Sequence, residues 1–272
     1  MIHKTRNIAL ILGISTLLAT GVVGCGWTGL QAANYKAVTK SSTPVQGDRT
    51  LDVQSENGAI DVQVWDSSEV EVEATIRATS QERLDKTNVI TKVEGSSIIV
   101  SVQWPDGKRL GSEGASLSIR VPKCKGSVLK TSNGAIKAAG RLGTSKFHSS
   151  NGAITVADSD GELDVSSSNG AINVMGAHDQ VNAKTSNGKI SIALADDAKG
   201  PVNLASSNGA VTLDVGAAFT GIVDASTSNA SCVLKAGDGT TTKGKTLTHS
   251  FGSGETSKIK TSNGSVTISA KK

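Results

Sequence analysis

The pentapeptide Ser132-Asn133-Gly134-Ala135-Ile136 decides the fold of this chain, because it returns at short intervals along the sequence. Residues 150–154 and 168–172 match it residue for residue. Near copies lie at residues 186–190, 207–211 and 262–266, a degenerate copy at 228–232, and an outlying early copy at 56–60. From Asn133 the Asn positions are spaced by 18, 18, 18, 21, 21 and 34 residues. A short, fixed period is the signature of a repeat protein, in which each unit packs only on its neighbours.

Each repeat alternates between inward and outward positions on both sides of its Asn-Gly. The positions four residues before the Asn, and three and five after it, are almost all aliphatic, and the position two before it is Ser or Thr. Period-two alternation predicts half-buried β-strands. The sequence therefore predicts an all-β protein with two short strands in each repeat.

Two all-β folds fit this pattern. Asn-Gly between alternating segments is a strong hairpin signal, since both residues tolerate positive φ, and a row of hairpins would make an antiparallel meander. In a parallel β-solenoid, each stretch of 18–21 residues makes one coil, and Asn-Gly forms the corner between its two strands. We favour the solenoid, because nearly identical coils can stack like on like at roughly 4.8 Å per coil. A meander has no need for identity at every turn.

The stacked corners predict an asparagine ladder. In a solenoid the side chains of successive Asn residues lie one above the other and can hydrogen-bond along the stack while satisfying backbone groups at the corner. The residues expected to form this structural ladder are Asn133, Asn151, Asn169, Asn187 and Asn208.

The first 24 residues are predicted to be a lipoprotein signal peptide. Lys4 and Arg6 precede an apolar stretch that is short and broken by Gly, Ser and Thr. The stretch ends in Val22-Val23-Gly24-Cys25, which resembles the bacterial lipobox, with Val22 in place of the usual Leu. By that resemblance, Cys25 would carry a thioether-linked diacylglycerol and an acylated amine, which together anchor a protein stably. The expected location is the bacterial cell envelope, and Gly26 allows the outer membrane if the host has one.

Charge and cysteine content narrow the possible partners. Loss of Lys4 and Arg6 would lower the formal charge from +4 to +2, so no nucleic-acid partner is expected. Beyond Cys25 the chain has Cys124 and Cys232. A solenoid would hold these two about five coils, or roughly 24 Å, apart, so no disulfide is expected between them.

The mature chain divides into three predicted regions. Residues 25–47 read as a lipidated N-terminus and tether, and residues 48–122 as a divergent β-rich section that caps the open end of the solenoid. In this section residues 79–88 could form one short helix. Residues 123–272 hold the solenoid repeats, with a Gly/Thr-rich excursion at 237–257 and a last coil at 258–270 that is expected to close the stack.

With the lipobox, the acidic N-terminal strands and the Ser-Asn-Gly-Ala-Ile coils, residues 48–270 resemble the bacterial putative-adhesin β-solenoid family, which is related to the head domains of auto-transporter adhesins. The resemblance implies an envelope-located parallel β-helix, expected to be right-handed. It carries over no catalytic residue.

Signals for catalysis and for metal binding are weak in this sequence. His148 precedes Ser149, but Ser149 belongs to the inward hydroxyl positions, and no nucleophile-elbow motif surrounds it. No enzyme activity is therefore expected, and no cofactor. The acids of the loop at Asp158, Asp160 and Asp164 form the one weak candidate for Ca²⁺, because alternating carboxylates on a Gly-containing loop can bind this ion.

The sequence predicts a lipid-anchored, non-catalytic envelope protein that acts in surface adhesion or as an envelope scaffold. Its expected partners are the membrane, through the lipid, and a glycan, a matrix component or an envelope protein. One alternative is a β-helix protein that binds or cleaves polysaccharide, although the repeats offer few aromatic side chains for stacking on sugars. A second alternative is a periplasmic partner in envelope-stress signalling.

Overall fold

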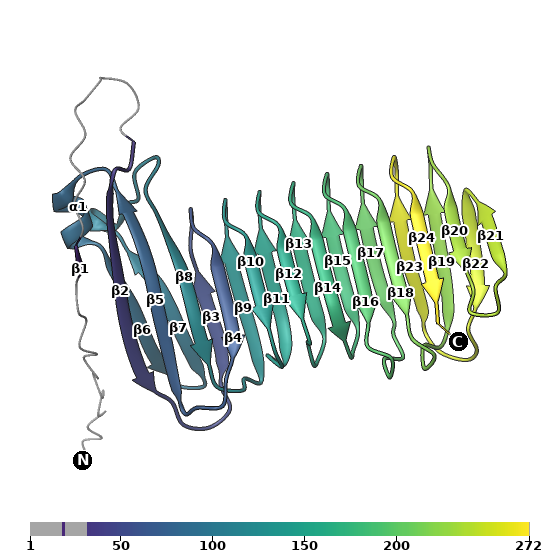
Figure 1. Ribbon diagram of the computed structural model, residues 1–272, viewed down its shortest axis with the longest axis horizontal. Coiled ribbons are helices and arrows are strands. Elements are labelled where there is room, and N and C mark those ends of the chain that lie inside the picture. The colour runs from purple at the N-terminus through teal and green to yellow at the C-terminus, as the bar shows by residue number, and fades with distance from the viewer. Residues whose placement is uncertain (1–17, 20–31, 272) are drawn as a thin grey trace, which may run out of the picture.

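The computed structural model describes residues 18–19 and 32–271, which form an elongated stack of β coils (Figure 1). Each regular coil contributes one strand to each of two long sheets, and the Asn-Gly corner joins these two strands. Neighbouring regular coils pair in parallel. The predicted all-β, parallel β-solenoid is confirmed, and the antiparallel meander is wrong.

The two sheets run along the stack side by side. The first sheet has 13 strands, in the order β1 (Leu18–Ala19), β2 (Tyr35–Pro44), β5 (Glu69–Ala78), β8 (Gly114–Val121), β4 (Ile60–Val64), β10 (Ile136–Ala139), β12 (Ile154–Ala157), β14 (Ile172–Ala177), β16 (Ile190–Leu194), β18 (Val211–Val215), β24 (Val266–Ala270), β20 (Cys232–Lys235) and β21 (Thr241–Gly244). The second sheet has 11 strands, in the order β22 (Thr246–Ser250), β19 (Ile222–Thr227), β23 (Thr256–Thr261), β17 (Val202–Ser206), β15 (Val181–Thr185), β13 (Leu163–Ser167), β11 (Thr144–Ser149), β9 (Gly126–Thr131), β3 (Thr50–Gln54), β7 (Ser97–Gln103) and β6 (Asn88–Glu94).

The core lies between the two sheets and is built from aliphatic columns. In the first sheet Ile136, Ile154 and Ile172 stand in register, one in each successive coil, and all three are fully buried. The facing column of the second sheet holds Leu129, Phe147 and Val165 at equivalent positions. Stacking like on like fills the narrow space between the sheets with side chains of similar size, which accounts for the near identity of the repeats.

The order of the coils along the stack differs from their order in the sequence. The last coil, β23–β24, lies between the coil β17–β18 and the coil β19–β20, and it pairs in parallel with both. The prediction that residues 258–270 close the stack is therefore wrong. In the same way the early coil β3–β4 lies between β7–β8 and β9–β10, so the outlying copy at residues 56–60 is a regular coil inside the stack.

The predicted tether is also wrong at residues 35–44. Residues 35–44 form β2, which pairs antiparallel with β5 from Tyr35 to Pro44. Only Ala37 of this strand is buried, so the sequence lacks the aliphatic alternation that marks the other strands. The strand is held by its backbone hydrogen bonds and by polar side-chain contacts such as Lys40 with Glu73. Cys25 lies outside the described residues.

Antiparallel strands close both ends of the stack. At the N-terminal end β2 pairs with β5 and β6 pairs with β7, and the short helix α1 (Gln81–Lys86) packs on β2 and β5. At the C-terminal end β21 pairs with β20 and β22 with β19. Such strands cover the open edges of a parallel stack, which would otherwise recruit other strands. Among the described residues no helix has the length and hydropathy to span a bilayer.

Candidate functional site

The inner side of each corner is held by a hydroxyl group. The Ser or Thr two residues before the Asn is buried. Its hydroxyl accepts a hydrogen bond from the backbone N–H of the Gly of its own corner, or of Ala230 in the coil β19–β20. It donates one to the Gly carbonyl of the neighbouring coil. In the central coil Gly170 N donates to Ser167 Oγ at 2.9 Å, and Ser167 Oγ donates to Gly152 O at 3.1 Å. These hydroxyls therefore bond to the backbone, which leaves few buried polar groups unsatisfied at the corner.

The Gly of each corner is required by close packing and not by its dihedral angles. None of the seven corner glycines, all within the described residues, has positive φ, so the hairpin argument for Asn-Gly does not apply here. A Cβ on Gly170 would lie 1.9 Å from the carbonyl oxygen of Gly152, and one on Gly152 would lie 1.8 Å from that of Gly134. A residue without a Cβ lets successive coils approach this closely, and Ala takes this position only at Ala230, in the coil β19–β20.

The outer side of the corner carries the asparagine ladder. From Asn151 onwards, each Nδ2 donates to Oδ1 of the Asn in the preceding coil of the stack, at 2.6–2.7 Å. All seven side chains are exposed. The ladder runs along the stack in the order Asn133, Asn151, Asn169, Asn187, Asn208, Asn263 and Asn229. The five residues named from the sequence lie together, and two more extend the row.

Two further columns flank the ladder on the side of the second sheet, and with it they make one continuous surface that we call the corner strip. Directly beside the Asn residues lie the Ser residues that precede them: Ser132, Ser150, Ser168, Ser186, Ser207, Ser262 and Ser228. The next outward-facing column, three residues before each Asn, holds Lys130, His148, Ser166, Lys184, Ala205, Lys260 and Ser226. None of these positions carries a carboxylate. The corner strip is thus a row of hydroxyl, amide and ammonium groups.

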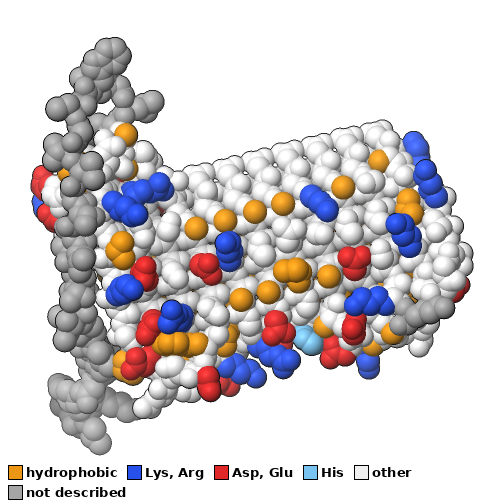
Figure 2. Space-filling view, in the orientation of Figure 1, with side chains coloured by type: hydrophobic (Ala, Val, Ile, Leu, Met, Phe, Trp, Pro, Cys, Tyr) orange, Lys and Arg blue, Asp and Glu red, His pale blue; other side chains and the backbone are white. Residues whose placement is uncertain are grey.

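Charged side chains elsewhere on the stack are spread unevenly. Figure 2 shows one face on which the middle coils carry few charged side chains, while charges gather towards the ends and along one edge. In the column next to the lysines, Lys146 Nζ lies 3.1 Å from Asp164 Oδ2, so this pair is neutral overall. Lys130, Lys184 and Lys260 form no ion pair with the described part of the chain.

The three acids considered for calcium do not converge. Each contacts a different partner: Asp158 lies 3.5 Å from His178 Nε2, Asp160 accepts the Gly143 N–H at 2.9 Å, and Asp164 pairs with Lys146. Within the residues that the structure describes, no three His, Cys, Asp or Glu side chains gather as metal ligands would. The structure therefore contradicts this candidate site, because the acids serve to tie neighbouring coils together.

His148 and Ser149 lie on opposite faces of β11. The imidazole of His148 is exposed, and its Nδ1 lies 2.9 Å from Ser166 Oγ in the next coil. Ser149 is fully buried, and its Oγ donates to the Gly134 carbonyl. Adjacent strand residues point to opposite faces, so this His cannot act on this Ser.

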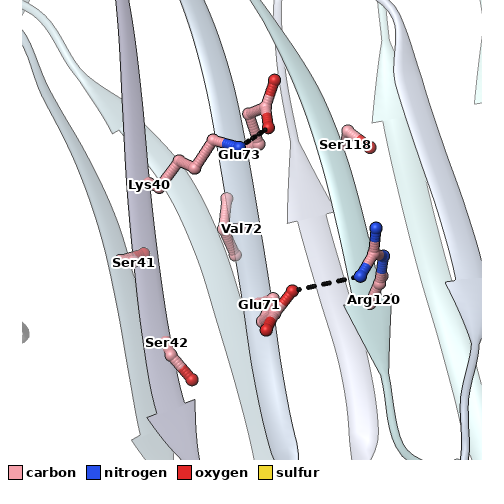
Figure 3. A pocket seen from close by; sticks show the side chains of 8 residues that line it. All are labelled: Lys40, Ser41, Ser42, Glu71, Val72, Glu73, Ser118 and Arg120. Carbon is pink, nitrogen blue, oxygen red and sulfur yellow. Dashed lines mark hydrogen bonds and ion pairs between the residues drawn. The ribbon is translucent and has the colours of Figure 1, made fainter. Parts of the chain in front are cut away.

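An open depression of about 440 Å³ lies over β2, β5 and β8 at the N-terminal end (Figure 3). Its charged side chains already contact each other: Lys40 Nζ lies 2.7 Å from Glu73 Oε2, and Arg120 lies 3.5 Å from Glu71. Val72 is the one apolar residue in its lining. Small-molecule pockets are mostly apolar with a few converging polar groups, and this depression lacks that character.

The most buried charge in the described chain is Glu113, which the sequence reasoning did not single out. Its carboxylate is fully buried and accepts two hydrogen bonds from Arg83, at 2.7 and 2.8 Å, and others from Thr79 and from the N–H of Leu110. Burial by itself would raise the pKa of Glu113, but the bonds from Arg83, Leu110 and Thr79 outweigh it and lower the pKa to about 2. This cluster fixes α1 to the loop before β8.

Both described cysteines are free and buried. Burial, with a smaller effect of Asp48, raises the pKa of Cys124 to about 12, and burial also raises the pKa of Cys232. The expectation that these two residues form no disulfide is confirmed. Neither thiol has the exposure or the electropositive surroundings of a reactive cysteine.

No family model and no curated protein sequence matches this chain. Among solved structures it is similar to a putative cell adhesion protein from Clostridium sporogenes, with 12% identity and a TM-score of 0.40 over 85% of this chain and 99% of that one. It is also similar to a putative adhesin from Bacteroides fragilis, with 11% identity and a TM-score of 0.42 over 86% and 96% of the two chains. A putative adhesin from Parabacteroides distasonis shows 12% identity and a TM-score of 0.40 over the same shares.

Proposed function

We propose that this chain is a non-catalytic protein of the bacterial envelope, anchored by lipid on Cys25, that acts in adhesion or in envelope scaffolding. The proposal rests on the surface of the stack and not on the names of the three similar structures. The corner strip is the observation that carries it. It repeats the same Ser-Asn pair on seven successive coils, without a carboxylate in its three columns.

A repeated surface of this kind acts by multivalency. Each coil can offer a partner only a few weak contacts, but contacts made by one long ligand add up without a separate association cost for each. The hydrogen-bonded stack also presents these contacts in a fixed geometry, so little side-chain order is lost on binding. A long partner that follows the stack gains most from both effects.

The polar groups considered above for chemistry hold the fold together. Ser149 and Glu113 are buried, and they bond to the Gly134 carbonyl and to Arg83, while Asp160 and Asp179 accept backbone N–H groups of neighbouring coils. A general base must lie within hydrogen-bond reach of a substrate proton, and the buried Ser149 and Glu113 do not. This arrangement supports a binding role.

The anchor and the location need a cellular test. We would compare the wild-type chain with Cys25→Ala in intact and in lysed cells, treated with protease and probed with antibodies against the solenoid. Wild-type chain in the membrane fraction that protease removes from intact cells would support a surface adhesin. Protection until lysis would contradict adhesion and favour an internal scaffold or a signalling partner. A soluble fraction unchanged by Cys25→Ala would contradict the lipid anchor.

Cleavage of polysaccharide is the second candidate, because Glu71 and Glu73 face outward two residues apart on β5 (Figure 3). That spacing is roughly 7 Å, within the range for an inverting glycosidase. Both carboxylates are about half exposed and each contacts a cation, however, whereas a general acid needs an apolar setting that keeps it protonated. Release of reducing ends from a polysaccharide that is lost in Glu71→Gln and in Glu73→Gln would establish this alternative.

A further inference from the structure

The corner strip has a definite electrostatic character, which identifies the chemistry of its partner. Lys130, Lys184 and Lys260 are exposed and stand in one column of the second sheet. Lys184 lies three coils beyond Lys130, about 14 Å away, and Lys260 lies two coils beyond Lys184, about 10 Å away. No carboxylate interrupts the column between them. At the end of the strip Lys245 adds a fourth ammonium group, which donates to the Ser228 carbonyl at 3.0 Å.

The acids nearest to these lysines lie in the two neighbouring columns, and two of them are paired with other cations. Glu56, which precedes Asn57 in the coil next to Lys130, pairs with Arg109 at 2.9 Å, and Asp164 pairs with Lys146. Asp52 stands in register with Val128, one coil before Lys146, and Asp224 lies in the coil β19–β20. Lys258 stands in register with Asp224 in the same column. The middle of the lysine column therefore has a positive potential that no neighbouring acid of the described chain cancels.

The partner must be recognised without aromatic stacking. Residues 123–272 contain no Trp and no Tyr, and Phe147, the Phe of the regular coils, is buried. A neutral sugar chain would have little to bind here, since stacking on aromatic rings supplies much of the contact area in polar recognition sites. An anionic chain would gain charge-assisted hydrogen bonds from the lysines and ordinary ones from the Ser and Asn groups beside them.

We propose that the corner strip binds a linear anionic polysaccharide, which lies along the stack with its acid groups at Lys130, Lys184 and Lys260 and its hydroxyl groups at the Ser and Asn columns. This inference rests on the proposed binding function and gives it a ligand class. The repeat of the strip matches the repeat of a polymer, and its charge is complementary to the ligand.

The test is binding of the full-length chain, carrying Cys25→Ser so that lipid does not drive association, to polygalacturonate. The triple variant Lys130→Gln, Lys184→Gln, Lys260→Gln is compared with Lys137→Gln, Lys235→Gln, Lys243→Gln. The second set removes three exposed lysines from strands of the first sheet, so both variants lose the same charge. We expect the affinity to fall about tenfold in the first variant and less than about threefold in the second. Melting temperatures measure whether both remain folded.

Equal losses in the two triple variants would overturn the proposal, since net charge alone would then explain the binding. Binding of neutral dextran as tight as that of polygalacturonate would also overturn it. So would binding to phosphatidylglycerol vesicles through the same lysines with none to polygalacturonate, which would make a lipid surface the partner. If polygalacturonate fails while cells still attach through this protein, only the ligand class is wrong. If deletion of the protein leaves attachment unchanged, the adhesion role itself fails.

Discussion

Asn208 and Asn263 are 55 residues apart in the sequence, yet the Nδ2 of Asn263 donates to the Oδ1 of Asn208 at 2.6 Å. This bond joins β23–β24, the last coil in the sequence, to β17–β18, which does not directly precede it in the sequence. On the other side Asn229 donates to Asn263 at 2.6 Å. The chain thus forms the coil β19–β20 one position away from the coil β17–β18. It then returns, and β23–β24 occupies the position between these two coils. The end of the sequence is the middle of this part of the stack.

Removal of the last coil should therefore cost more than the loss of an end repeat. Deletion of residues 256–272 takes away the strands that pair β18 with β20 and β17 with β19. The coil β19–β20 would lose its parallel connection to the rest of the solenoid. We expect residues 216–255 to unfold while the coils before them stay folded. Hydrogen exchange followed by mass spectrometry measures this region by region.

The matched control removes only Lys271 and Lys272. Lys271 forms an exposed ion pair with Asp196, and its backbone N–H donates to the Val215 carbonyl. Exposed pairs of this kind contribute little to stability, so we expect all the coils of this protein to stay folded. Equal protection of residues 222–235 in both truncated proteins would contradict the pairing of the last coil described above.

An asparagine of the ladder should contribute most to stability where it is hydrogen-bonded to an asparagine on each side. Asn169→Ala removes two hydrogen bonds, one to Asn151 and one from Asn187, whereas Asn229→Ala at the end of the ladder removes one. At about 1 kcal/mol for each bond, we expect losses of about 2 and about 1 kcal/mol. Urea denaturation gives both values. An unchanged midpoint for Asn169→Ala would contradict the structural role of the ladder.

The corner glycines should tolerate no side chain. In Gly170→Ala the new Cβ would meet the Gly152 carbonyl oxygen at 1.9 Å, so the coils must separate, and we expect a loss of more than about 3 kcal/mol. Gly95→Ala is the comparison, because Gly95 has φ of 56° and open space around its Cβ position. Its cost should be about 1 kcal/mol, which reflects backbone strain alone. Similar losses in the two variants would show that dihedral strain and not contact decides the corner.

Much of the solenoid could be predicted from the repeats, because the alternation of aliphatic and polar residues in each repeat shows which side chains point inward and which point outward. Ile136 and Ile154 stand at the same distance after an Asn-Gly, and the structure pairs them directly. The same reasoning places the asparagine side chains in one row. Local periodicity is a property of a short segment, so it can be read without knowing which segments are neighbours.

The order of the coils could not be predicted, because the repeats are interchangeable at their contact surfaces. Val211 pairs with Ile190 on one side and with Val266 on the other, and both neighbours fit equally well. The sequence of a single coil therefore does not determine its place in the stack. The tether was mistaken for a similar reason, since β2 is held mainly by backbone bonds that leave no pattern in the side chains. Glu113 was overlooked because its partner Arg83 is 30 positions away and only the fold brings the two together.

The thiols of Cys124 and Cys232 should be inert in the folded protein. Burial raises the pKa of both, so the thiolate that reacts with iodoacetamide is scarce at neutral pH. We expect no labelling of either residue in native buffer at pH 8 and full labelling of both in denaturant. Peptide mass spectrometry distinguishes the two sites. Rapid labelling of Cys232 in native buffer would show that the coil β19–β20 opens locally.

The buried pair of Glu113 and Arg83 should make the stability of the chain depend on pH below about 4.5. The pKa of Glu113 falls from 4.5 to about 2 in the folded state, so the unfolded chain binds a proton more readily. The stabilisation is therefore fully present above pH 4.5 and is lost as the pH falls towards 2. It amounts to at most about 3 kcal/mol.

Glu113→Gln should lose about 3 kcal/mol at pH 7, because Arg83 is left without its partner, and it should show a weaker dependence on pH between 4.5 and 2. Glu71→Gln breaks an exposed pair with Arg120 and should change stability by less than about 1 kcal/mol at any pH. Urea midpoints measured for the three proteins at pH 7, 4.5, 3.5 and 2.5 test this, and parallel curves for wild type and Glu113→Gln would contradict the assigned role of Glu113.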